Sequence, residues 1–133
     1  MLTPDLIARI EAAQPSEARE LFEEAWRAVH GGDPQWCQYY SEDIELRHGA
    51  RSYSNKLQAE AYLDAAAMFL PERVGHWPQV CTISTNPNNP SSQKERVEIW
   101  MKNGGRPFRG HATTPYFALL AAAMKARQTD ERD

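Results

Sequence analysis

The chain has 133 residues, 41% hydrophobic and 25% charged, a composition typical of one soluble globular domain. Its formal net charge is −3 with the histidines neutral, which argues against broad nucleic-acid binding through a basic face. No apolar run approaches the roughly 18 residues of a membrane span, and we expect no signal peptide. Two cysteines, Cys37 and Cys81, imply no disulfide scaffold, and we expect both to be reduced in the cytoplasm.

Two helices are predicted at the start of the chain. Thr3-Pro4-Asp5 places a capping residue, a proline and an acid in the order that begins a helix. Pro15-Ser16-Glu17 ends this helix and begins the next, in which apolar residues recur at helical spacing over 18–29. Gly31-Gly32 ends the second helix.

Residues 33–54 show no clear period, and we expect irregular structure there. Asp33-Pro34 favours a helical turn, residues 44–46 a short extended piece, and residues 49–55 a loop. A third helix is then predicted over 55–70, because apolar residues recur at helical spacing up to a proline at position 71.

The period then changes to that of strands. Residues 80–84 are β-branched and short, residues 86–92 have the composition of a loop, and residues 96–102 alternate between apolar and polar side chains. Asn103-Gly104-Gly105 indicates a hairpin, after which residues 107–111 favour an edge strand that tolerates a proline.

A last helix is predicted with Thr113 or Thr114 as cap, Pro115 at its first position, and Lys125 and Arg127 near its end. The expected fold class is α+β: a small antiparallel sheet of two or three strands packed against several helices, in the order α-α-α-β-β-(β)-α. We expect one domain over residues 1–127 and a frayed polar tail over 128–133.

Catalytic and metal motifs are not recognisable in the sequence. Its histidines and cysteines show no Cys-x-x-Cys, His-x-x-x-His or His-Glu-x-x-His spacing, and its serines form no Gly-x-Ser-x-Gly elbow. We therefore expect a protein that is not an enzyme and that holds no metal or cofactor. The four histidines, expected to be scattered surface residues, are His30, His48, His76 and His111.

Aromatic residues mark a candidate interface. Trp36, Tyr39 and Tyr40 lie within five positions, where they either bind a partner or ligand or cover an open side of the core. Trp100 lies on the more polar face of its predicted strand, so that strand is either buried on both sides or presents the indole to a partner. This arrangement leaves a homodimer open.

A candidate anion site precedes the last helix. Arg106, Arg109 and His111 lie just before the predicted helix start at Thr114, and helix N-termini and arginines both attract phosphate groups. The residues therefore suggest a site for a nucleotide or another small anion. The alternative is an edge strand whose arginines are merely solvated.

Two segments resemble the phage α-β-α sandwich domain group. Residues 62–71 read YLDAAAMFLP and are followed by Trp77, and residues 112–126 read ATTPYFALLAAAMKA. The resemblance covers mainly residues 57–126 and implies a phage- or prophage-derived α+β domain, in the cytoplasm of a bacterial host, with no family-wide catalytic residues. Residues 30–55 depart from it.

The sequence therefore predicts a non-enzymatic phage or prophage accessory protein that binds a host or defence protein. The alternative function is a small-molecule binder that uses the candidate anion site.

Overall fold

The computed structural model describes residues 3–71, 79–84, 93–100 and 106–132, and for 79–84, 93–94 and 129–132 it describes the backbone. The elements are, in chain order, α1 (Pro4–Glu11), η1 (Pro15–Glu17), α2 (Ala18–His30), α3 (Pro34–Tyr40), α4 (Ile44–Gln58), α5 (Tyr62–Ala67), β1 (Gln79–Ser84), β2 (Gln93–Ile99), β3 (Phe108–Ala112) and α6 (Pro115–Arg132). This arrangement confirms the α+β class and the order of the sheet and the last helix.

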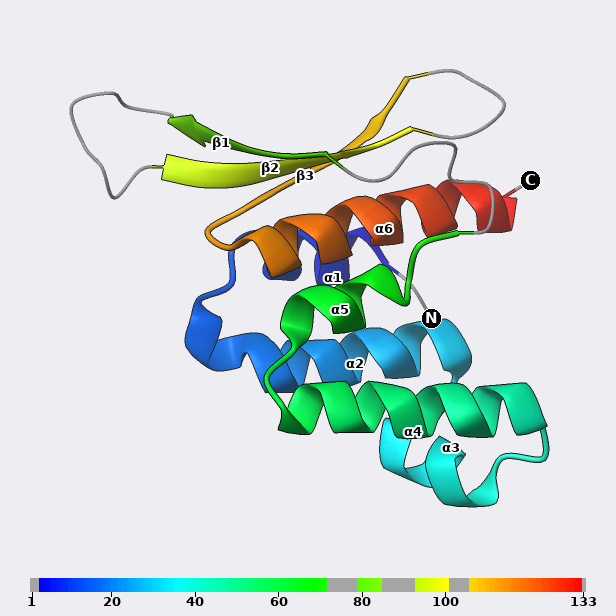
Figure 1. The fold of residues 1–133 in the computed structure, drawn as a ribbon. Helices are drawn as coiled ribbons and strands as arrows, with labels where there is room; N and C mark the ends of the chain where they lie inside the picture. Colours follow the sequence, from blue (N-terminus) through cyan, green and yellow to red (C-terminus); the bar gives the residue numbers. More distant parts are fainter. Residues whose placement is uncertain (1–2, 72–78, 85–92, 101–105, 133) are drawn as a thin grey trace.

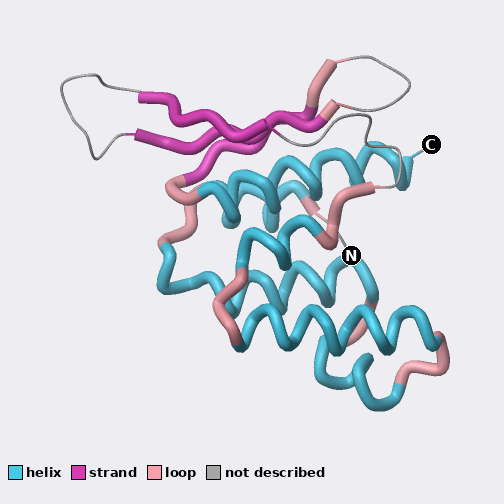
Figure 2. Tube along the Cα trace, viewed as in Figure 1, coloured by secondary structure: helices cyan, strands magenta, loops and turns pink. Residues whose placement is uncertain are grey.

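The three strands form an antiparallel sheet in the order β1-β2-β3, so β3 is the edge strand that the sequence predicts. Helix α6 packs against β3 and β2, and α1 packs against α6. Figures 1 and 2 show the sheet at one side of the molecule and the α3–α4 pair at the opposite side, with the other helices between them. The fold therefore separates the sheet from the α3–α4 pair.

The contact between α6 and the sheet is unusually close at Gly110. A Cβ on Gly110 would lie 2.0 Å from the carbonyl oxygen of Ala118 and 2.7 Å from the amide nitrogen of Ala122. Val97 and Ile99 of β2 are also fully buried. The alanine-rich sequence of α6 is explained by this packing, because small side chains let the helix backbone approach the strand.

Aromatic side chains join α2, α4 and the segment that follows α5. Trp26 and Tyr53 have ring centroids 4.7 Å apart, and Tyr53 and Phe69 are in edge contact at 5.5 Å. The Tyr53 hydroxyl donates a hydrogen bond to the carbonyl oxygen of Phe22. These contacts fix the inner face of α4, so its outer face is held in a defined orientation.

The helical turn expected from Asp33-Pro34 is confirmed as α3, but the expectation of irregular structure over the rest of 33–54 is wrong. The extended piece expected at 44–46 is the first turn of α4, where the Asp43 carboxylate accepts hydrogen bonds from the amides of Glu45 and Leu46. The loop expected at 49–55 lies inside the same helix. Polar and small residues obscure the helical period there, although Ala50, Tyr53 and Leu57 form a buried stripe.

The single helix expected over 55–70 is also wrong, because α4 ends at Gln58 and α5 begins at Tyr62. Between them Glu60 adopts a left-handed conformation with φ of 58°. The amide of Ala61 donates to the carbonyl oxygen of Lys56 at 2.8 Å, and the amide of Glu60 donates to the carbonyl oxygen of Leu57 at 3.2 Å. This is a Schellman motif, and the sequence conceals it because glutamate occupies the position that usually holds glycine.

Smaller differences concern element ends. Strand β2 covers residues 93–99 where 96–102 was expected, and α6 continues to Arg132, so the frayed tail expected from position 128 is helical up to that residue. The predicted loop at 86–92 and hairpin turn at 103–105 lie outside the described residues. Within the described ranges, no helix has the length and apolar character needed to cross a membrane.

Candidate functional site

Helix α3 presents three aromatic side chains to solvent. Its start is fixed by Asp33, whose carboxylate accepts from the amide of Gln35 at 3.2 Å, and its inner side is fixed by buried Cys37. Trp36, Tyr39 and Tyr40 point away from the core and keep 54%, 60% and 68% of their surface exposed. Of the two interpretations that the sequence leaves open, this exposure favours binding of a partner or ligand over covering of the core.

The aromatic side chains also lie close to one another. The ring centroids of Trp36 and Tyr40 are 6.2 Å apart, and those of Tyr39 and Tyr40 are 6.4 Å apart. Ile44, the first residue of α4, adds a further apolar side chain that is 64% exposed. We call these four residues the aromatic patch.

The connection between α3 and α4 is held by Arg47. Its guanidinium donates two hydrogen bonds, of 3.0 and 2.6 Å, to the carbonyl oxygen of Ser41, the residue that follows α3. The Ser41 hydroxyl in turn accepts from the amide of Asp43. These bonds fix the three-residue turn, so the two helices hold the residues of the aromatic patch in a defined relative orientation.

Trp100 is a separate feature. It follows β2 directly and is 37% exposed, at the side of the molecule opposite α3 and α4. The structure therefore does not join Trp100 to the aromatic patch, and the two parts of the predicted interface are distinct surfaces.

The residues of the candidate anion site do not converge on the start of α6. Gly110 and Ala112 are buried against α6, so Arg109 and His111, which alternate with them, face the other side of the sheet. The Arg109 guanidinium lies 3.3 Å from the Glu98 carboxylate. The backbone carbonyl oxygen of Arg109 accepts a hydrogen bond from the Lys125 ammonium. Lys125 lies ten residues, or about 15 Å, along α6 from the first residue of that helix.

The other candidate anion ligands have local roles or lie apart. Thr114 caps α6, since its hydroxyl accepts from the amide of Phe117 at 3.3 Å. The backbone amide of His111 donates to the Glu11 carboxylate at 3.0 Å, and Arg106 is exposed before β3. An anion site at these four positions remains a prediction, and its members are spread along β3 and beyond it.

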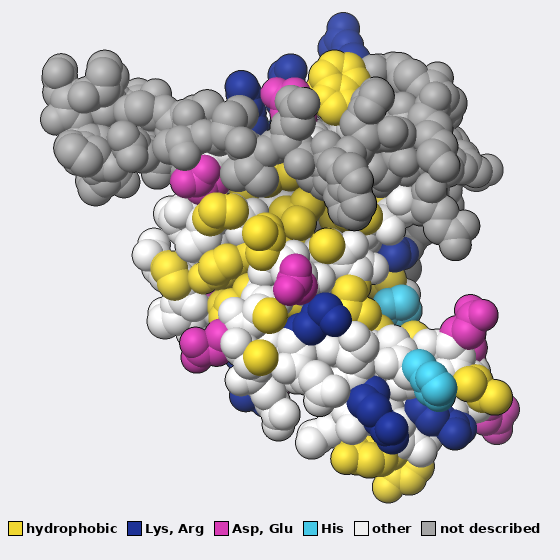
Figure 3. All heavy atoms as spheres, viewed as in Figure 1, with side chains coloured by type: hydrophobic (Ala, Val, Ile, Leu, Met, Phe, Trp, Pro, Cys, Tyr) yellow, Lys and Arg dark blue, Asp and Glu magenta, His cyan; other side chains and the backbone are white. Residues whose placement is uncertain are grey.

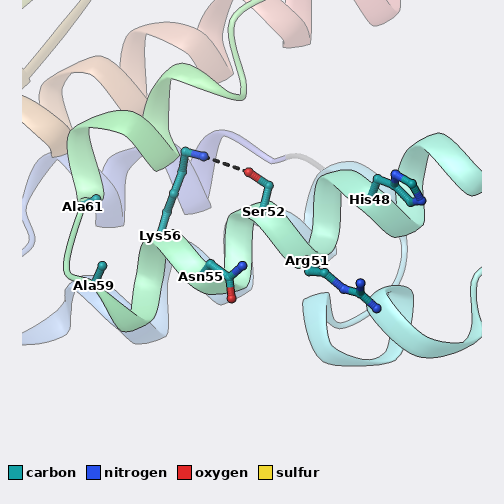
Figure 4. Close-up of a pocket in the computed structure, with 7 residues that line it drawn as sticks. All are labelled: His48, Arg51, Ser52, Asn55, Lys56, Ala59 and Ala61. Atoms are coloured by element: carbon teal, nitrogen blue, oxygen red, sulfur yellow. Dashed lines mark hydrogen bonds between the residues drawn. The ribbon is translucent and has the colours of Figure 1, made fainter.

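A basic hollow on α4 was missed by sequence reasoning. It has a volume of about 480 Å³ and is lined by His48, Arg51, Ser52, Asn55, Lys56, Ala59 and Ala61. Figure 4 shows these residues along α4 and in the connection that follows it, with the Lys56 ammonium donating to the Ser52 hydroxyl at 2.8 Å. The spacing of His48, Arg51 and Asn55 fits a common helical face, but the loop-like composition of residues 49–55 conceals the helix.

The basic hollow and the aromatic patch occupy the same end of the molecule. In Figure 3, yellow hydrophobic side chains at the α3–α4 end lie beside dark-blue basic ones and a cyan histidine. A small polar groove of about 190 Å³ between α2, α3 and α4 is lined by Tyr39 of the patch and by Asn55 of the hollow. The features therefore form one continuous surface.

One histidine is set apart by its surroundings. The His30 imidazole packs 4.1 Å from the Trp26 ring, centroid to centroid, and stacks on Phe69 at 6.5 Å. Burial, and secondarily the charge of Arg127, lowers the pKa of His30 below its ordinary value.

In the part of the chain that the structure describes, no three side chains of the metal-binding types form a group. His76 and the Cys81 side chain lie outside that part.

Comparison with known proteins adds no relative. No model of a protein family matches the chain, and neither curated proteins nor solved structures give a significant match. The function has to be argued from the surface itself.

Proposed function

We propose that this chain acts by binding a protein partner through the aromatic patch on α3 and α4. The observation that carries the proposal is the exposure of Trp36, Tyr39, Tyr40 and Ile44, each more than half exposed, on two helices joined by a fixed turn. Large exposed apolar clusters on soluble proteins mark interaction sites, and tryptophan and tyrosine are enriched among the residues that dominate binding energy.

The packing beneath the patch supports the same proposal. Because buried Cys37 holds the inner side of α3 and Tyr53 packs on Trp26 beneath α4, the backbone that carries the patch costs little ordering entropy when a partner binds. Exposure of four large apolar side chains to water has an unfavourable free energy, and burial of these side chains against a partner removes that cost.

The wider role that we propose is that of a phage or prophage accessory protein whose partner is a host or defence protein. This part of the proposal rests on the resemblance of residues 57–126 to the phage α-β-α sandwich domain group. The aromatic patch belongs to residues 30–55, which lie outside that resemblance, so we expect the partner to be particular to this chain.

Site-specific crosslinking in a bacterial lysate tests the proposal. The photoreactive residue p-benzoylphenylalanine replaces Tyr40 in one protein and Leu63 in a matched control, since Leu63 is a 47% exposed apolar residue of α5 outside the patch. We expect a discrete crosslinked protein from position 40 and none from position 63. The captured protein is identified by mass spectrometry, purified and tested for direct binding.

Competition then establishes that the patch itself is responsible. Unlabelled wild-type chain should abolish the crosslink, whereas the double variant Tyr39→Ser/Tyr40→Ser should not. Equal capture from both positions, or equal competition by both proteins, would show that the aromatic patch is not the binding surface. A third protein that carries the crosslinker at position 100 shows whether the partner instead contacts the Trp100 region.

A further inference from the structure

The exposed side of α4 continues the aromatic patch into the basic hollow. Four residues at spacings of four, three and four positions form a single stripe: Ile44, His48, Arg51 and Asn55. The stripe extends for about 16 Å along the helix, because each residue advances the axis by about 1.5 Å. A single bound segment about three helical turns long could therefore contact both features.

The two cationic side chains of the hollow lack acidic partners. Within the described ranges, the Arg51 side chain has no ion pair or hydrogen bond, and the Lys56 ammonium donates to the neutral Ser52 hydroxyl. Neighbouring Arg47, in contrast, is committed to the carbonyl oxygen of Ser41. The hollow is therefore an unneutralised positive site next to an apolar one.

Acidic side chains lie at the starts of the two helices. Asp33 lies before α3, and Glu42, Asp43 and Glu45 lie at the start of α4, all exposed. A continuous polyphosphate laid along the stripe would be repelled by these carboxylates, whereas a chain with isolated negative charges would not. The charge pattern thus favours a peptide with carboxylates at defined positions over a nucleic acid.

We infer that the partner contributes a segment in which large apolar side chains are accompanied by aspartate or glutamate. The apolar side chains bury the aromatic patch, and the carboxylate enters the hollow beside Arg51, on the same helical stripe as His48. Arg51 can bind a carboxylate with two parallel hydrogen bonds, and the Asn55 amide can both donate to and accept from a peptide backbone. The inference rests on the proposed function and adds the chemistry of the partner.

A displayed library of random peptides, panned against the full chain, tests the inference without knowledge of the partner. We expect the selected peptides to be enriched in both acidic and large apolar residues. Their affinity, measured by fluorescence polarisation, should fall about tenfold or more in Arg51→Glu and less in Arg51→Gln. It should also fall as salt concentration rises.

The matched control is Arg106→Glu, which makes the same charge change at an exposed position before β3. It should leave peptide affinity within about twofold of wild type, because it lies beyond the Debye length of the hollow. Circular dichroism and thermal melts of both variants should match wild type, since Arg51 faces away from the core.

The outcomes separate the inference from the proposed function. Peptides that lose binding in Tyr39→Ser/Tyr40→Ser but lack acidic enrichment and ignore Arg51→Glu would overturn the inference and leave the patch as a binding site. A library that yields no binders would also overturn it, while the crosslinking experiment decides the proposed function independently. A fluorescein-labelled oligonucleotide that binds more tightly than the peptides and is released by Arg51→Glu would assign the surface to nucleic acid instead.

Discussion

The carbonyl oxygen of Ala118 in α6 occupies the space that a Cβ on Gly110 of β3 would need, 2.0 Å away. Gly110→Ala therefore forces the helix and the strand apart, and we expect the free energy of unfolding to fall by about 3 kcal/mol. Urea denaturation followed by circular dichroism measures the change.

Gly49→Ala is the matched control for this substitution. A Cβ on Gly49 would meet only the Trp26 ring, at an ordinary 3.8 Å, and Gly49 lies inside α4. This variant should gain about 0.5–1 kcal/mol, because alanine favours helix more than glycine does. Equal effects from the two substitutions would contradict the close approach of β3 and α6.

The left-handed Glu60 gives a second stability prediction. Its φ of 58° is unfavourable for a residue with a Cβ, so Glu60→Gly should raise the free energy of unfolding by about 1 kcal/mol. Glu60→Gln removes the charge but keeps the Cβ, and should change stability by less than about 0.5 kcal/mol. If the glutamine variant gained as much as the glycine variant, charge rather than backbone conformation would be the cause.

The surroundings of His30 predict a pH dependence of stability. Burial lowers the pKa of His30 in the folded protein below the ordinary value of 6.5, so the unfolded chain binds the proton more readily. The contribution of neutral His30 to the free energy of unfolding is therefore complete above pH 6.5. It is lost as the pH falls below 6.5 toward the pKa of His30 in the folded protein. Urea denaturation at several pH values measures it.

The control for this pH dependence is His30→Gln, which cannot take up a proton. It should show a smaller loss of stability than wild type between pH 7 and about pH 5, whatever its stability at neutral pH. Parallel losses in the two proteins would assign the pH dependence to other groups.

The separation of Arg109 from the start of α6 predicts that nucleotides do not stabilise the protein. Arg109 already faces Glu98 at 3.3 Å, and Thr114 uses its hydroxyl to cap the helix. Addition of about 5 mM ATP should leave the melting temperature unchanged, because a ligand raises it only by preferring the folded state. A rise that is lost in Arg109→Ala would establish the anion site that the sequence suggests.

The sheet and α6 could be predicted because their patterns are strong. Residues 96–99 alternate between charged and buried side chains, and Thr114 and Pro115 mark the start of α6. Neighbours in a strand or at a helix cap interact locally, so the sequence alone contains the information.

The α3–α4 region could not be predicted in the same way. The buried stripe of α4 has only Ala50, Tyr53 and Leu57 as members. A glycine before the stripe and two serines within it favour loops in isolation. Packing of Tyr53 against Trp26 outweighs that local preference. Because the helix was missed, the grouping of His48 with Arg51 was missed as well.

Gly31 and Glu60 both have left-handed backbone conformations, and they lie at the two ends of the segment that contains α3 and α4. The exposed residues of the proposed binding surface therefore lie in one stretch of the chain, apart from the contact between β3 and α6. We expect exposed positions such as Tyr40 and Arg51 to mutate at little cost to stability, and Gly110 and the alanines of α6 not to. If the proposed function holds, the binding surface can change its sequence while the fold stays the same.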